Sequence, residues 1–242
     1  MTTSARPSLP PAHTRRGVAV IRGILPAPVA SAEVFRDLPH AVLFPGEEAA
    51  IRGAPEARRT EFRTVRHCAR TALGELGLAP VPILPGPRRE PQWPEGIVGS
   101  MTHCAGYRAA AVARAGDIAS LGIDAEPHEA LPDGMLPAVA RPEEVDRLAG
   151  LYVRRPEVHW DRLTFSAKES VYKAWFPLAR RWLGFHDASL TLHPDRRTFD
   201  VSLHDNRLPL GGRSLTTLSG RWTVEDGLIA TCVVVDAAAA AA

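Results

Sequence analysis

Two acidic residues, Asp124 and Glu126, directly follow the apolar run at residues 118–123. In an extended strand, residues i and i+2 project from the same face, so we expect the two carboxylates to lie side by side. Such a pair repels itself unless a cation or a proton lies between the two groups. Because Mg²⁺ prefers carboxylate and phosphate oxygens, the pair indicates a divalent-metal site. The alternative is a solvated strand end that leads into a loop.

A second cluster lies in the long amphipathic stretch at residues 159–182, where Lys168 and Lys173 flank Glu169. These two are the only lysines among the 29 Lys and Arg residues of the chain. On a helix, Glu169 and Lys173 are i,i+4 neighbours. A lysine that persists in an arginine-rich chain suggests a need for a compact ammonium, which suits phosphate oxygens. An ordinary Glu–Lys pair on a helix surface is the alternative.

Two further groups could contact phosphate. Thr102 and His103 end a small-residue strand at residues 97–103, although a core or turn histidine would also explain them. One face of the predicted helix at residues 55–78 carries arginines, which bind phosphate bidentately or simply face solvent. These are Arg58, Arg59, Arg63 and Arg66. The His67-Cys68 and His103-Cys104 pairs lack zinc-site spacing, so we do not expect zinc.

The elements that position these residues follow from hydrophobic periodicity. Helices are predicted at 55–78, 142–150 and 159–182, and strands at 17–21, 97–103, 107–113, 118–123, 188–192, 198–203, 216–224 and 228–235. The order, a long helix and strands, twice over, predicts an α+β fold with two subdomains, residues 16–121 and 122–236. Residues 1–15 and the alanine tail, 237–242, are predicted to be disordered.

Composition restricts the class of protein further. The 242 residues are 45% hydrophobic, enough for one large or two small domains. A net charge of +2 argues against nucleic acid as a partner held by bulk charge. No run of 18 apolar residues or secretory signal is evident, so no membrane association is expected. Three scattered cysteines fit a reducing compartment, and we expect a cytoplasmic protein.

The motifs G-I-D-A-E at 122–126 and F-S-A-K-E-S-V-Y-K-A at 165–174, about 40 residues apart, resemble the paired motifs of 4'-phosphopantetheinyl transferases. The segments W-F-P-L at 175–178 and W-L-G-F at 182–185 are similar to the Sfp-type branch, which includes enterobactin synthetase component D. Residues 66–70 and 99–108 resemble the same branch. The resemblance covers roughly residues 55–235.

The resemblance implies two similar subdomains related by a pseudo-twofold axis, each with a long helix on a small antiparallel sheet, in a monomer. It implies transfer of the phosphopantetheine arm of coenzyme A to a serine of an acidic acyl or peptidyl carrier protein, with release of 3',5'-ADP. Mg²⁺, or Mn²⁺, would serve as the cofactor.

It also implies a role for each matching residue. Asp124, Glu126 and Glu169 would bind the metal, and Glu169, Asp124 and Lys173 would be catalytic. Coenzyme A would be held by Arg58, Arg66, Thr102, His103, Lys168 and Lys173. Relatives often carry a basic residue near position 85, where this chain has Pro85, so Arg88 or Arg89 is the expected substitute.

Two other functions fit the same residues. A metal-dependent phosphohydrolase would use the three carboxylates, and a non-catalytic protein that binds coenzyme A or a nucleotide would use the basic residues. Whether Glu169 or a metal-bound water is the base stays open, as does the preferred carrier. For carrier docking, the candidates are Arg63, Arg70 and the end of the second long helix, with Arg180 and Arg181.

Overall fold

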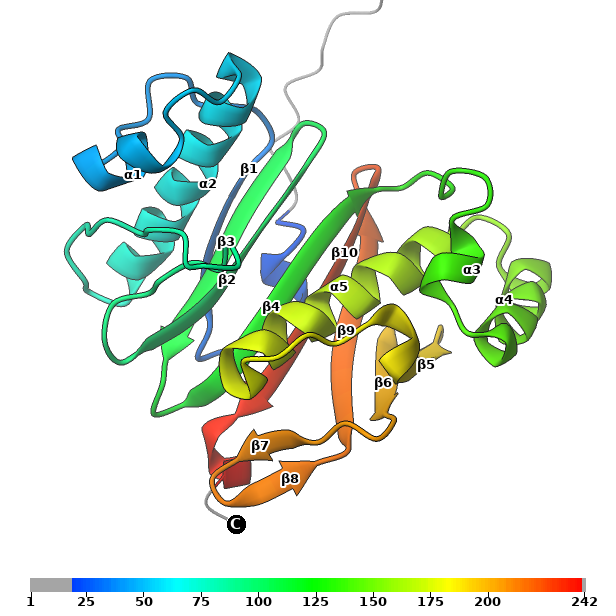
Figure 1. Ribbon diagram of the computed structural model, residues 1–242. Helices are drawn as coiled ribbons and strands as arrows, with labels where there is room; N and C mark the ends of the chain where they lie inside the picture. The colour runs from blue at the N-terminus through cyan, green and yellow to red at the C-terminus, as the bar shows by residue number, and fades with distance from the viewer. Residues whose placement is uncertain (1–18, 241–242) are drawn as a thin grey trace, which may run out of the picture.

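The computed structural model describes residues 19–240 and contains two large antiparallel sheets, each covered by one long helix, and a further two-stranded sheet (Figure 1). The fold is α+β, as predicted. The first sheet has the order β1-β3-β2, and the second has the order β4-β10-β9-β6-β5. Their strands are β1 (Ala30–Val34), β2 (Ile97–Cys104), β3 (Tyr107–Arg114), β4 (Ile118–Pro127), β5 (Ala188–His193), β6 (Thr198–Leu203), β9 (Thr217–Glu225) and β10 (Leu228–Asp236).

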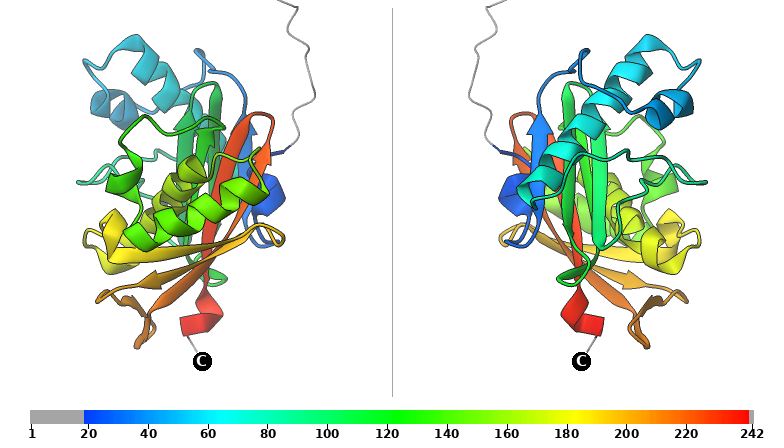
Figure 2. Two further views of the ribbon diagram at one scale, coloured as in Figure 1. Left: turned by 90° about the vertical axis from the view of Figure 1, so that its right-hand side faces the viewer. Right: turned by 90° about the vertical axis from the view of Figure 1, so that its left-hand side faces the viewer.

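The helix α2 (Glu56–Glu75) lies across the first sheet, which Figure 2 shows in its right-hand view. Its apolar residues, among them Ala69 and Leu73, pack against Ala110 and Val112 of β3. The helix α5 (Trp160–Ala179) packs on β4 and β10 of the second sheet. Each helix therefore buries one apolar stripe against its own sheet, which is the basis of an α+β layer.

The two sheets meet where β2 lies beside β4, without forming a continuous ladder. Side-chain hydroxyls take the place of ladder bonds. Ser100 Oγ accepts a hydrogen bond from the Ile123 amide at 3.1 Å, and Thr102 Oγ1 accepts one from the Ala125 amide at 3.0 Å. The seam thus holds the end of β4 in register with the end of β2. A pseudo-twofold relation between the halves stays a prediction.

Shorter elements complete the fold. They are the 3₁₀ helices η1 (Arg22–Ile24), η2 (Phe185–Asp187) and η3 (Ala237–Ala240), the helices α1 (Pro45–Ala50), α3 (Leu136–Val139) and α4 (Pro142–Arg154), and the strands β7 (Leu208–Leu210) and β8 (Arg213–Leu215). Within residues 19–240, no helix is both long enough and apolar enough to cross a membrane.

The structure corrects the sequence prediction at both ends of the chain. Of the strand predicted at 17–21, the described residues 19–21 form no strand, because Val20 and Ile21 lie in a turn whose amides donate to the Glu33 carboxylate. The first strand is instead β1. The predicted disorder at 1–15 lies outside the described residues, whereas residues 237–240 form η3. The proposed subdomain boundary after residue 121 falls inside β4, which pairs with β10 on both sides of that position.

Candidate active site

A cleft of about 1280 Å³ lies between α2, the loop that precedes β2, and α5. Its polar lining is predominantly basic, and it gathers residues from both halves of the chain. These residues include Arg58, Arg66, Arg88, Arg89, Ser100, His103, Glu169, Tyr172, Lys173 and Arg180. A concave site with several arginines suits a ligand that carries several phosphates.

Asp124 is buried at the seam, with 4% of its surface exposed. Its Oδ1 accepts hydrogen bonds from Lys173 Nζ at 2.7 Å and from Thr102 Oγ1 at 3.3 Å. Its Oδ2 is buried and has no hydrogen-bond partner in the described part of the protein. A buried acceptor without a donor is costly, so Oδ2 marks a position where a cation would be favoured.

The other two acidic residues lie around Asp124. Glu126 Oε2 pairs with Arg162 Nη1 at 3.0 Å. Burial raises the pKa of Glu126, and the charge of Asp124 raises it further. Burial also raises the pKa of Glu169, with Lys173 opposing the shift and Asp124 adding to it. Between residues 19 and 240, no ion pair within 4 Å engages the Glu169 carboxylate.

The predicted metal ligands do not form a preassembled site. Among the described residues, no three His, Cys, Asp or Glu side chains form a group that could hold a metal ion. Lys173 and Arg162 instead neutralise Asp124 and Glu126. The donor set still fits a divalent cation, because it consists of carboxylate oxygens, one of which has no partner.

His103 lies between Glu61 and Arg58 at the rim of the cleft. Its Nδ1 is 2.9 Å from Glu61 Oε1, and its Nε2 is 3.1 Å from Arg58 Nη1. Because a guanidinium can only donate, Nε2 is the acceptor and the proton lies on Nδ1. Burial lowers the pKa of His103; Glu61 opposes this shift, and the positive charges of Arg58 and Lys173 add to it. His103 is therefore neutral in this arrangement.

Three of the residues expected to bind coenzyme A lie in other surroundings. Thr102 is buried in the seam and contacts Asp124. The Arg66 guanidinium lies over the Phe62 ring, and its Nε donates to the Ile83 carbonyl at 3.0 Å, although the residue still lines the cleft. Lys168 is buried against Glu144 and does not line the cleft. The structure therefore brings Arg58, His103, Glu169 and Lys173 together there, but not Lys168.

The structure adds Glu61, Glu144 and Arg162 to the residues around the site, none of which was predicted from the sequence. Arg162 also donates to the Glu129 and Ala130 carbonyls, so it anchors the loop after β4 to α5. Its spacing of seven residues from Glu169, two helical turns, was a usable signal for a shared face. Glu144 gave no such signal, because it lies in another helix.

A small apolar pocket of about 110 Å³ adjoins the cleft. Glu169 and Tyr172 line both cavities, which places the pocket next to the carboxylate. Its other walls include Val171, Trp182, Leu183, Phe185, Ala188 and Leu190. The site thus combines a basic cleft with an apolar pocket, an arrangement that suits a ligand with a phosphate-bearing end and an uncharged end.

The fold and the site together indicate an α+β protein that binds a ligand with several phosphates. Comparison with known proteins gives its family. Residues 46–113 match the model of the 4'-phosphopantetheinyl transferase N-terminal domain, and residues 120–226 match that of the 4'-phosphopantetheinyl transferase superfamily.

Curated relatives agree with these matches. The chain is 52% identical to the 4'-phosphopantetheinyl transferase Svp of Streptomyces mobaraensis, over 92% of both chains. It is 48% identical to the transferase PptT of Mycobacterium tuberculosis, over 89% of this chain and 97% of that one. It is 32% identical to enterobactin synthase component D of Salmonella typhimurium, over 84% and 82%. The chain belongs to the 4'-phosphopantetheinyl transferase family and is an enzyme of that class.

Proposed function

We propose that this enzyme transfers the 4'-phosphopantetheine arm of coenzyme A to a serine of an acyl or peptidyl carrier protein and releases 3',5'-ADP. The observation that carries the proposal is the pairing of the two cavities at Glu169. Coenzyme A has a nucleotide end with three phosphates and a long, uncharged pantetheine arm. The basic cleft would take the nucleotide, and the apolar pocket would take the arm. A cytoplasmic location belongs to the same proposal.

Mg²⁺, or Mn²⁺, is the proposed cofactor, with Asp124, Glu126 and Glu169 as its ligands. When bound, the ion would supply positive charge that offsets the charge of the pyrophosphate and of the departing 3',5'-ADP. The orphaned Asp124 Oδ2 supports this assignment. Thr102 would keep the Asp124 carboxylate oriented through its hydroxyl rather than contact coenzyme A.

The remaining roles belong to side chains of the cleft. Arg58 and His103 would bind phosphates of the nucleotide end, and Arg66 would support that wall. Lys173 carries a fixed positive charge close to Asp124 and would stabilise charge on the pyrophosphate. Arg88 and Arg89 line the cleft in the loop beyond Pro85 and are the proposed substitutes for the missing basic residue.

In the transfer step, the serine oxygen attacks the phosphorus that carries the pantetheine arm. The bond between this phosphorus and the bridging oxygen breaks, and that oxygen leaves with 3',5'-ADP. Glu169 would take the serine proton, because burial raises the pKa of its carboxyl and makes it a stronger base than an exposed glutamate. Its carboxylate would hold the ion through one oxygen and would have the other oxygen for the proton.

Mass spectrometry of an apo carrier protein tests the proposal. The carrier is incubated with this enzyme, coenzyme A and Mg²⁺, and we expect its mass to rise by one phosphopantetheinyl group. Omitting the enzyme, or adding a chelator, should prevent the change. Released nucleotide with an unmodified carrier would indicate a phosphohydrolase instead. Bound coenzyme A with neither product would indicate a non-catalytic binding protein.

A further inference from the structure

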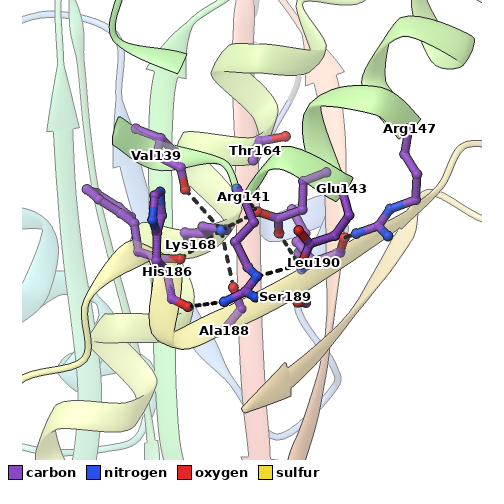
Figure 3. A network of polar contacts seen from close by, with 12 residues as sticks. Val139, Arg141, Glu143, Arg147, Thr164, Lys168, His186, Ala188, Ser189 and Leu190 are labelled. Carbon is purple, nitrogen blue, oxygen red and sulfur yellow. Dashed lines mark hydrogen bonds and ion pairs between the residues drawn. The ribbon is translucent and has the colours of Figure 1, made fainter. Parts of the chain in front are cut away.

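Lys168 lies in a buried polar network (Figure 3) and also lines the apolar pocket. Its ammonium is 2.7 Å from Glu144 Oε2 and donates to three backbone carbonyls. These carbonyls are Phe185 at 2.8 Å, Val139 at 3.0 Å and Ala188 at 3.2 Å. With 5% of its surface exposed, Lys168 has these contacts in place of water.

Glu144 continues the network from α4. Its Oε1 accepts from the Leu190 amide at 2.5 Å, and its Oε2 accepts from the Arg141 amide at 2.6 Å. Arg147 Nη2 donates to the Leu190 carbonyl at 3.1 Å, so two side chains of α4 bind both backbone groups of one residue of the edge strand β5. The Lys168–Glu144 ion pair and the hydrogen bonds of its two side chains therefore join α3, α4, η2 and β5 to α5.

The residues that this ion pair fixes are also the wall of the pocket. Phe185, Ala188 and Leu190 line the pocket on one side, and Lys168 and Glu169 line it from α5. The length of the Lys168 side chain thus sets the separation between α5 and the opposite wall. Since Glu169 is the next residue along α5, the same contacts fix the wall relative to its carboxylate.

We propose that Lys168, paired with Glu144, is a positioning residue that shapes the pocket for the pantetheine arm and does not contact the phosphates of coenzyme A. The inference rests on the proposed function. It also explains why position 168 is lysine in an arginine-rich chain. Three carbonyls and a carboxylate surround one point. The three N–H groups of a compact ammonium can serve them from that point, with one proton shared between two acceptors, whereas a planar guanidinium spreads its donors over a rigid fork. A buried ion pair is weak evidence for stability, but it can enforce one geometry.

Isothermal titration calorimetry with two ligands tests the inference. One ligand is coenzyme A, and the other is adenosine 3'-phosphate 5'-diphosphate, which has the same phosphates and no arm. For Lys168→Arg we expect the Kd of coenzyme A to rise about tenfold, the order of effect of a reshaped apolar pocket. The Kd of the armless nucleotide should stay within about twofold, since its ligands are untouched.

Two further variants keep the test decisive. Glu144→Gln retains the shape of its side chain and should give the same split, and it replaces Lys168→Arg if that variant does not fold. Lys173→Met should weaken both ligands, because Lys173 lines the cleft. Equal weakening of both ligands by the Lys168 or Glu144 variants would show a phosphate role and overturn the inference.

An unchanged Kd for both ligands in a folded variant would show a purely structural role and would also overturn it. Failure of the natural chain to bind coenzyme A would instead contradict the proposed function. The two failures are therefore distinguishable.

Discussion

Asp124 has two donors on one carboxylate oxygen and none on the other. For Asp124→Asn we expect carrier modification in Mg²⁺ to slow about 100-fold or more, the size typical of losing one electrostatic partner of a transition state. Initial rates of holo-carrier formation would measure this. Circular dichroism would check that the fold is intact, and a variant that retains activity within a few-fold would show that Asp124 is not a metal ligand.

The lowered pKa of His103 predicts that nucleotide binding depends on pH. Its pKa in the free protein is lowered, first by burial, and Nε2 accepts a hydrogen bond from Arg58. A bound polyanion would favour protonated His103 and raise its pKa, so binding would take up a proton. We therefore expect the affinity for 3',5'-ADP to increase as the pH falls through the pKa of His103 in the complex, and to level off below its lowered pKa in the free protein.

Calorimetry at several pH values, in buffers of different ionisation enthalpy, would measure both the affinity and the proton uptake. The variant His103→Gln serves as the control and should lose most of the pH dependence. An affinity that is independent of pH in the natural chain would mean that His103 does not face the nucleotide phosphates.

At the scale of elements, the contact between β4 and α5 aligns the acidic residues with Glu169. Gly122 makes this contact possible, because a Cβ at this position would lie 1.9 Å from the Ser170 carbonyl oxygen and 2.6 Å from the Ala174 nitrogen. Both atoms belong to the backbone of α5, so neither can move without the helix. Gly122 therefore sets the distance between the strand that carries Asp124 and the helix that carries Glu169.

We expect Gly122→Ala to lower the free energy of unfolding by about 1–3 kcal/mol, as overpacking does, and to reduce transfer more than stability alone explains. Gly74→Ala in α2 is the matched control, since a Cβ there meets nothing within 4 Å. It should be stabilising by about 0.5–1 kcal/mol. Urea unfolding would measure both variants. A Gly122→Ala protein as stable and active as the natural one would show that α5 can shift freely.

Elements with strong periodicity were predictable from the sequence, and those defined by distant partners were not. The strands at 188–192, 198–203, 216–224 and 228–235 and the two long helices agree with the structure to within a few residues. The apolar residues Val20 and Ile21 suggested a strand, whereas the Glu33 carboxylate holds them in a turn. β1 itself, Ala30–Val34, was not predicted.

The residues of the site likewise include some whose position local spacing predicted and others whose position depends on distant partners. The i,i+2 spacing of Asp124 and Glu126 and the i,i+4 spacing of Glu169 and Lys173 predicted that acidic and basic side chains would gather here. Lys173 does pair with Asp124, whereas the roles of these residues stay predictions. The orientation of Lys168 was not predictable, because it depends on Glu144, 24 residues away on α4. Helical spacing places a side chain on a face but does not say which element covers that face.

At the scale of the molecule, the cleft exists only because the two halves are joined at the seam of β2 and β4. The first half contributes Arg58 and His103, and the second contributes Glu169 and Lys173. The hydroxyls of Ser100 and Thr102 tie the two sheets together next to the acidic group.

The exposure of the basic residues around the cleft predicts where a carrier protein would dock. Arg70 is a poor candidate, because its guanidinium binds the buried Glu47, and Arg63 is mostly covered and donates to the Pro39 carbonyl. The end of α5 is open instead. Arg180 lines the cleft with 69% of its side chain exposed, and Trp182 lines the pocket with 64% exposed.

We predict that an acidic carrier docks at the end of α5, next to the two cavities, so reversing the charge there should weaken docking. For Arg180→Glu combined with Arg181→Glu we expect the KM for the carrier to rise about tenfold at low salt, because rim charges mainly set the association rate. The difference should shrink at about 1 M salt, where the Debye length falls to about 3 Å. Saturating coenzyme A removes any effect of Arg180 on that substrate.

The control, Arg154→Glu combined with Arg196→Glu, changes the net charge equally at exposed positions of α4 and of the β5–β6 turn. If both double variants raise KM alike, only the net charge of the enzyme matters; if neither does, the carrier docks on another surface.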